Sequence, residues 1–323
     1  MRFVFSVCAA FLTILSGVHA HTVDLRSLPL GDGQVSQEPR VGSVYACQTR
    51  FNPNAPGARR TGDWLNETAG TFDLTRKPTV DGNVVHLSEL EIAISGTTRI
   101  VSGNGLPDHP TGQFPIARTD DAYFYDRNPN SIRAHTYSVS LPLNPVIASR
   151  PSCLPMGAIG IMLTGAVLFN ALDARGENAL AHEILDRCQG HPQQSGLYHY
   201  HGKSPCQDDP TPAQDHSTLI GYALDGFGIY GYHGEGGQPL ASSDLDECHG
   251  HIGSVMINGE MQTVYHYHAT PDYPYTLSCF RGVPTSIAGL SGGGGGQAGG
   301  RAGPQRAPRH GEGVQRPPHR RPW

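Results

Sequence analysis

Apolar and polar residues alternate over short segments through much of the chain. At residues 80–101 and 137–141 this alternation, interrupted by Gly, Pro and Asn, is typical of antiparallel strands. Two continuous apolar runs, residues 158–163 and 165–169, indicate buried strands joined by a turn, although apolar periodicity alone does not exclude a helix. Asp225-Gly226 lies between two further apolar runs and favours a hairpin, because both residues of such a turn must tolerate positive φ.

A helical period is clearest at residues 177–187, where Leu180, Ile184 and Leu185 recur at the spacing of one helix face. The strand-like segments outnumber this helical one. We therefore expect a mainly β fold, with antiparallel strands in a sandwich-like arrangement and one or two short helices.

One tetrapeptide, Tyr-His-Tyr-His, occurs twice, at residues 198–201 and 265–268. Residues two apart share a face of a strand, so each copy places two imidazoles on one side and two phenols on the other. The preceding residues repeat too, because 185–191 and 245–251 both have the pattern Leu-Asp-x-Cys-x-Gly-His. The chain therefore contains a duplicated half-site. We expect its two copies to flank a shared central hairpin and to converge on one pocket.

Neutral imidazole is the commonest protein ligand of zinc and copper, and two histidines two apart on a strand can share one ion. We therefore expect a bound transition metal, copper or zinc. The leading ligands are the histidines of the two tetrapeptides: His199, His201, His266 and His268. A supporting set comes from the preceding repeats: His191, His249 and His251.

The alternative is a buried hydrogen-bonded network in which the histidines and tyrosines only hold strands together. The metal hypothesis, as the sequence frames it, depends on the two tetrapeptides meeting. Ring nitrogens that lie far apart, in unrelated environments, would contradict it.

The amino terminus has the pattern of a secretory signal, residues 1–20. Arg2 precedes an apolar run from Phe3 to Leu15, and small residues lead to a cleavage point after Ala20. The run is too short to cross a bilayer, and no second long run follows. We therefore expect a secreted or periplasmic protein without a transmembrane segment.

Composition divides the rest of the chain. Gly, Pro and Arg dominate residues 289–323, which predicts a disordered tail. Residues 21–75 are rich in turn-forming residues, which predicts a loosely structured amino-terminal arm, and the β domain then occupies residues 76–288. Residues 21–288 carry 16 basic and 27 acidic side chains, a formal net charge of −11. This acidic body argues against nucleic acid as a partner.

Six cysteines remain after the signal, an even number that favours disulfides in an exported protein. Six cysteines allow 15 pairings, and the sequence does not choose among them. We expect Cys188–Cys206 and Cys248–Cys279, because each pair would clamp one half-site. Cysteine ligands for a metal are disfavoured, since an oxidising compartment turns thiols into disulfides.

Several separated blocks resemble the YHYH-domain family of exported proteins, over residues 141–282. The resemblance implies export, but no established activity or ligand set. The blocks are Gly-Leu-Tyr-His-Tyr-His-Gly at 196–202, Leu-Ile-Gly-Tyr-Ala-Leu-Asp-Gly-Phe-Gly-Ile-Tyr-Gly at 219–231, Leu-Asp-Glu-Cys at 245–248, the second tetrapeptide, Asp-Tyr-Pro-Tyr at 272–275 and Cys-Phe-Arg-Gly at 279–282.

The sequence does not decide whether the protein is an enzyme. Outside the Gly-rich tail at 289–323 it lacks a Gly-x-Ser-x-Gly elbow, it lacks a phosphate-binding loop, and His182-Glu183 begins a zinc-protease motif in which Asp186 replaces the second histidine. Three hypotheses remain: an exported metal-binding protein, a metal-dependent extracellular enzyme, and a disulfide-stapled structural or adhesion module. Four carboxylates are candidate general bases, although such residues more often cap turns and helices: Glu183, Asp225, Asp246 and Glu247.

Overall fold

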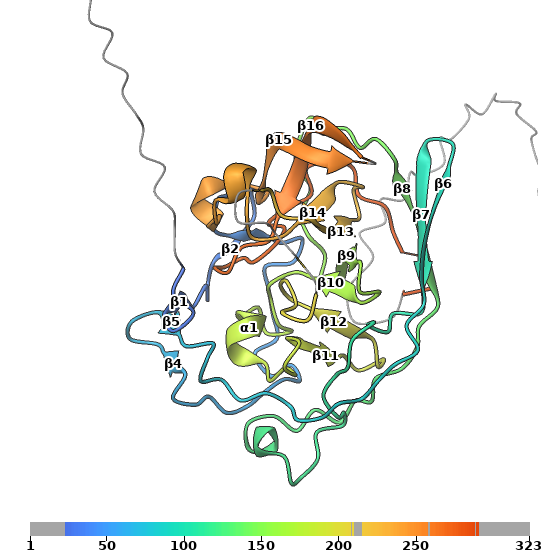
Figure 1. Ribbon diagram of the computed structural model, residues 1–323. Coiled ribbons are helices and arrows are strands. Elements are labelled where there is room, and N and C mark those ends of the chain that lie inside the picture. Colours follow the sequence, from blue (N-terminus) through green and yellow to red (C-terminus); the bar gives the residue numbers. More distant parts are fainter. Residues whose placement is uncertain (1–22, 208, 210–214, 258, 288, 291–323) are drawn as a thin grey trace, which may run out of the picture.

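The structure, a computed structural model, describes residues 23–207, 209, 215–257, 259–287 and 289–290. The predicted signal, and the predicted tail from residue 291 onward, lie outside these ranges. The regular structure of the described residues is mostly strand, with one α-helix and isolated 3₁₀ turns, which confirms the predicted mainly β class (Figure 1). Across those same ranges, no helix has the length and apolar character that crossing a bilayer requires.

Eight strands form the central sheet, in the order β11-β12-β10-β9-β13-β14-β16-β15. Most neighbouring strands are antiparallel, but β10 and β12 are parallel, as are β14 and β16. The strands are β9 (Ala158–Met162), β10 (Val167–Phe169), β11 (Gly190–Pro192), β12 (Tyr198–Tyr200), β13 (Leu219–Ala223), β14 (Gly228–Tyr230), β15 (Gly250–Ile257) and β16 (Glu260–His268).

The duplication seen in the tetrapeptide extends through this whole sheet. The first four strands in chain order pair in the same pattern as the last four, with β9 and β13 meeting at the centre. Ile161 lies opposite Tyr222, the residue at the same place in the other repeat. Gly160 and Gly221 are also equivalent, and a Cβ on either would approach a carbonyl oxygen of the facing strand to 2.9 or 2.7 Å. These glycines therefore allow the two repeats to join into one sheet.

The prediction that the two tetrapeptides converge on one pocket is wrong. Strands β12 and β16 lie five steps apart in the sheet, with two hairpins between them instead of one. At about 4.8 Å a step, this separates the tetrapeptides by about 24 Å. Figure 1 shows β15 and β16 at the top of the molecule and β11 and β12 well below them. The parallel pairing within each repeat moves each histidine strand outward.

The helix α1 spans only Ala179–His182, whereas the sequence predicts one over residues 177–187. The side chain of Asn178 caps its first turn, and the chain becomes extended at Glu183. The apolar period continues because Ile184 and Leu185 are buried, although they lie outside the helix. Burial of an irregular segment therefore produced a helical pattern.

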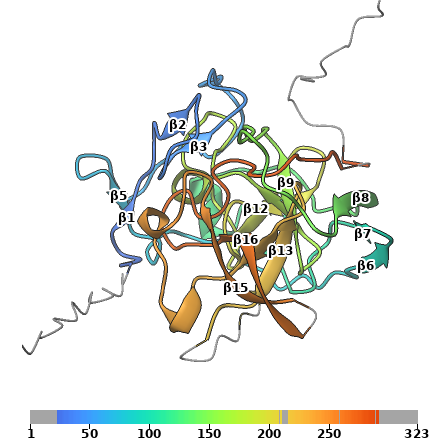
Figure 2. The ribbon, with the colours of Figure 1, turned by 90° about the horizontal axis from the view of Figure 1, so that it is seen from above.

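A three-stranded antiparallel sheet lies to one side of the molecule in both views (Figures 1 and 2). It contains β6 (Leu90–Ser95), β7 (Thr98–Gly103) and β8 (Tyr137–Pro142). The predicted strand character of residues 80–101 is found from Leu90 onward, while Val85 and Leu87 are exposed.

Residues 23–75, for which we expect a loosely structured arm, have little regular structure but pack into the core. Leu28, Trp64 and Phe72 are buried in the same cluster as the central sheet. The indole nitrogen of Trp64 donates to the carbonyl of Ala181 in α1, at 3.0 Å. The strands here are β1 (Leu28–Pro29), β2 (Val35–Ser36), β3 (Val44–Tyr45), β4 (Leu65–Asn66) and β5 (Thr71–Phe72).

Three disulfides link the described residues. Cys188–Cys206 and Cys248–Cys279 confirm the predicted pairing. Each disulfide holds the loop that precedes β11 or β15. The third, Cys47–Cys153, ties the amino-terminal segment to the residues before β9.

Candidate metal centres

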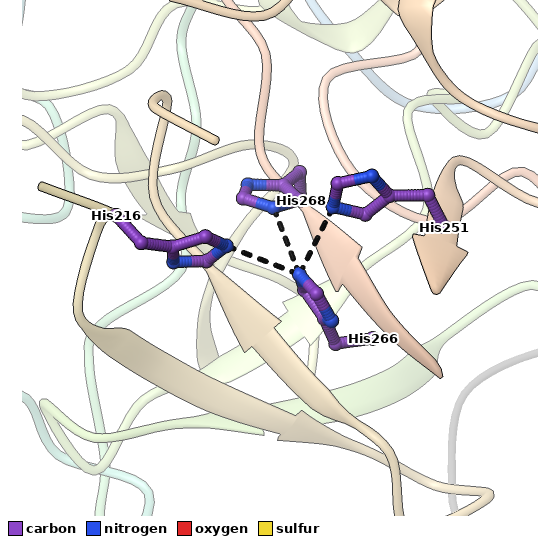
Figure 3. A group of neighbouring side chains, drawn as sticks. All are labelled: His216, His251, His266 and His268. Carbon is purple, nitrogen blue, oxygen red and sulfur yellow. Dashed lines mark hydrogen bonds between the residues drawn. The ribbon is translucent and has the colours of Figure 1, made fainter. Parts of the chain in front are cut away.

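The second tetrapeptide contributes to a cluster of four imidazoles, which we call the four-histidine site (Figure 3). Its members are His216, before β13, His251 on β15, and His266 and His268 on β16. The Nε2 atom of His266 lies 3.1 Å from the Nε2 atom of each of the other three rings. Strand alternation explains the last two, because residues two apart on β16 face the same way.

Backbone carbonyls fix the tautomer of three of these rings. Nδ1 of His216 and Nδ1 of His268 each lie 2.8 Å from a carbonyl oxygen, those of Ser217 and Gly231. Nδ1 of His266 lies 3.1 Å from the carbonyl two residues earlier on its strand. A carbonyl only accepts, so each Nδ1 carries the proton and each Nε2 presents a lone pair. Lone pairs therefore face one another across the short Nε2 contacts.

The first tetrapeptide contributes to an equivalent cluster, which we call the three-histidine site. It contains His191 on β11, His199 on β12 and His201 directly after β12. Nε2 of His199 lies 3.1 Å from Nε2 of His191 and 3.2 Å from Nε2 of His201. All three rings are buried. This site is entirely distinct from the four-histidine site.

The same backbone support recurs here. Nδ1 of His201 lies 2.5 Å from the carbonyl oxygen of Asn170, which occupies the position of Gly231 in the other repeat. Nδ1 of His199 lies 3.2 Å from the carbonyl two residues earlier, as in His266. A metal-binding imidazole commonly donates a hydrogen bond from the N–H of its second nitrogen in this way, and this bond sets the orientation of the ring.

Glu183 supplies a carboxylate to the three-histidine site. Its Oε2 lies 2.9 Å from Nε2 of His191 and 3.4 Å from Nε2 of His201, yet makes no hydrogen bond of normal geometry. Burial would raise the pKa of this carboxyl, but the neighbouring His191 and His201 outweigh burial and hold the pKa well below its usual value. The carboxylate is therefore charged. Buried Lys77 donates to the backbone carbonyl of Glu183 and anchors it.

Both sites have dimensions that suit a first-row metal. A tetrahedral ion with bonds of about 2.0 Å holds its ligands about 3.3 Å apart. The closest Nε2 contacts, 3.1 and 3.2 Å, are near this value, and all ligand atoms of each cluster lie within 4.8 Å of one another. Burial also lowers the pKa of His266 to about 3, and lowers the pKa of His199 and of His268 well below the usual value. The rings of His199, His266 and His268 are thus neutral, as metal binding requires, whereas at His191 the adjacent Glu183 carboxylate outweighs burial and raises the pKa.

Two equivalent loops position His191 in the three-histidine site and His251 in the four-histidine site. Asp186 accepts from the backbone N–H groups of Cys188 and Gly190, at 2.9 and 3.2 Å. Asp246 makes the same two bonds in the other repeat, at 2.9 and 3.0 Å. Each aspartate also accepts from the first tyrosine of its tetrapeptide. The tyrosine face thus secures the loop, while the opposite face presents the imidazoles.

Of the predicted ligands, the structure groups His191, His199 and His201 in one cluster and His251, His266 and His268 in the other. His249, from the supporting set, lies in neither. Its Nε2 contacts the hydroxyl of Thr270 at 3.0 Å, and its φ of 72° belongs to the tight loop. Two other candidate bases have structural partners. Asp225 accepts from the phenol of Tyr267 at 2.6 Å, and Asp246 accepts from the backbone N–H groups of its loop.

The sequence did not predict two residues of these sites as ligands: His216 and Glu183. Neither belongs to the duplicated pattern, because Pro155 and Ser243 occupy the equivalent positions. A third grouping, His109 with Cys188 and Cys206, is not a metal site because its two cysteines form a disulfide.

The three-histidine site opens into a large cavity of about 1070 Å³. Glu183 and the three histidines form part of its wall. The ring of Phe169 stacks on His199, with centroids 4.0 Å apart. A cavity of this size can hold a small organic molecule beside the cluster.

Comparison with known proteins supports the resemblance in the sequence. Residues 138–238 match the family described as YHYH protein. The match is shorter than the resemblance over residues 141–282, and the second tetrapeptide lies beyond it. No curated protein and no solved structure matches the chain. The matched residues 138–238 carry the first tetrapeptide and the whole three-histidine site, and this part of the chain is similar to the YHYH family.

Proposed function

We propose that this is an exported protein that binds two transition-metal ions, copper or zinc, one in each histidine cluster. The observation that carries the proposal is the convergence of Nε2 lone pairs. In each cluster, at least two rings use Nδ1–H for a backbone carbonyl, so their Nε2 atoms have no proton to share. A cation is what relieves such a convergence.

The same observation counts against the alternative of a purely structural network. Hydrogen bonds between rings need a donor at each contact, but His266 meets three other Nε2 atoms with its own Nδ1 proton already used. Protonating the rings would supply donors, although burial opposes the charged form. The three disulfides and the predicted signal support export.

Elemental analysis of the natively purified full chain tests this proposal. We expect close to two equivalents of copper or zinc per chain, and none in the His199→Ala plus His266→Ala double variant. A matched variant, His249→Asn, alters a buried histidine outside both clusters and should keep both ions. Metal-free wild type that takes up no ion on reconstitution would overturn the proposal and favour the structural module.

A metal-dependent extracellular enzyme is the second candidate, and the cavity beside the three-histidine site favours it. Such an enzyme needs a coordination position that a substrate can reach. Copper(II) spectra test this point. Azide should change the spectrum of His266→Ala, which keeps the three-histidine site. An unchanged spectrum would contradict an accessible ion.

A further inference from the structure

The cavity above the three-histidine site is lined by parts of the chain that are distant in sequence. Residues 48–60, 124–130 and 191–194 contribute to it, together with residues around Phe169. Hydrogen bonds between these segments hold the walls in place: Arg175 donates to the carbonyl of Ala58 at 2.7 Å, and Asn128 donates to the carbonyl of Pro192 at 3.1 Å. The cavity is therefore a built feature of the fold.

Positive charge gathers at this cavity, although the body of the protein carries a net charge of −11. Arg59, Arg60 and Arg127 line it and are exposed to solvent. None of the three forms an ion pair with another described residue. Guanidinium groups bind carboxylate and phosphate groups through paired hydrogen bonds. Three of them at one opening thus favour an anionic ligand.

The acidic groups of the cavity do not cancel this charge. Asp173 is paired with Arg175 at 2.8 Å, and Glu183 belongs to the histidine cluster. Asp126 is buried, and its carboxyl accepts from the backbone N–H groups of the next two residues. The arginines at the opening therefore face solvent with their charge available.

Aromatic rings provide an apolar surface beside the arginines. Phe124 is 59% exposed, and the guanidinium of Arg60 lies 4.3 Å from its ring centroid. Phe169 lies deeper, stacked on His199. An exposed phenylalanine next to a stacked arginine suits a ligand that has both a flat apolar body and a charged group.

We propose that this cavity binds a small organic anion, a phosphate ester or a carboxylate attached to a ring-shaped body. The arginines at the opening hold the charged group, and the ring lies against the aromatic wall. This inference goes beyond metal binding, because the arginines lie outside the histidine cluster.

Titration calorimetry with three probes tests the proposal on the full chain: phenyl phosphate, benzoate and the neutral isostere benzamide. We expect at least one anion to bind tenfold or more tightly than benzamide. The Arg59→Gln plus Arg60→Gln variant should weaken that binding at least tenfold and leave its metal content unchanged. Arg150→Gln, which removes an exposed arginine outside the cavity, is the matched control and should bind like wild type.

The same titration after chelator treatment separates this proposal from metal binding. Arginine-dependent binding that survives chelation supports the anion site, even in a protein that proves to hold no metal. Anion binding that is lost after chelation, and that is unchanged in the Arg59→Gln plus Arg60→Gln variant, would overturn it. The metal proposal would then still stand. Equal affinity for benzamide and both anions would also overturn it.

Discussion

His199 and His266 occupy equivalent positions in the two halves of one sheet, and each is the ring that its neighbours approach most closely. The Nε2 distances are 3.1 and 3.2 Å around His199 and 3.1 Å around His266. The duplicated tetrapeptide therefore does not build one shared site. It builds two sites, each completed by residues that lie near it in the fold.

Separate sites should lose their ions separately. We predict that His199→Ala binds one equivalent of metal in place of two, and that His266→Ala also binds one. Each substitution removes the central ring of one cluster about 24 Å from the other. Metal content by mass spectrometry, combined with spectra of the copper(II) form, distinguishes which site remains.

The two variants serve as controls for each other. Their spectra should differ, because one retained site has four imidazoles and the other has three with a carboxylate. If either single substitution abolished both equivalents, the two clusters would depend on each other, and the picture of independent sites would fail.

Local pattern predicted much of this arrangement. The period of two in Tyr-His-Tyr-His correctly indicates strands with imidazoles on one face, and Asp225-Gly226 marks the hairpin of β13 and β14. The disulfide pairing follows from the same duplication. These features depend on residues that are close in sequence, so the pattern of one sequence is enough to predict them.

The sequence could not show which elements complete each site. His216 and Glu183 come from segments that differ between the repeats, so the duplication carries no trace of them. The expected convergence failed because strand order depends on long-range pairing. The parallel contacts of β10 with β12, and of β14 with β16, have no local sequence signal.

The carboxylate of Glu183 should matter at one site alone. We predict that Glu183→Gln weakens metal binding at the three-histidine site by tenfold or more, because the amide keeps the shape but removes the negative charge that faces the ion. The four-histidine site should keep its affinity. Competition with a coloured chelator measures both constants. Glu247→Gln is the control, and a loss of similar size in that variant would contradict the prediction.

Asp225 provides a pH test that the histidines do not obscure. Burial raises the pKa of this carboxyl, although Tyr267 and backbone N–H groups oppose the shift. The folded state therefore takes up a proton at a higher pH than the unfolded chain. Between the raised pKa and about 3.8, the folded carboxyl is protonated while the unfolded one is charged, so acid favours folding through this group.

We therefore predict that the unfolding free energy of wild type, minus that of Asp225→Asn, increases as the pH falls from 7 to 4. Urea titrations of both proteins without metal give this difference. The histidine contributions cancel because both chains contain them. A difference that decreased with acid would mean that the carboxyl has a lowered pKa in the folded state.

The two loop aspartates should differ in their contribution to stability, although they make the same backbone bonds. Asp186 is fully buried and also accepts from the N–H of Gly112, at 3.0 Å, whereas the side chain of Asp246 is 28% exposed. Each buried donor left without a partner costs about 1–3 kcal/mol. We expect Asp186→Ala to cost about 4 kcal/mol and Asp246→Ala about 2 kcal/mol, since water can reach the second loop. Urea unfolding of the metal-free proteins measures both. Equal losses would show that solvent access does not separate the two loops.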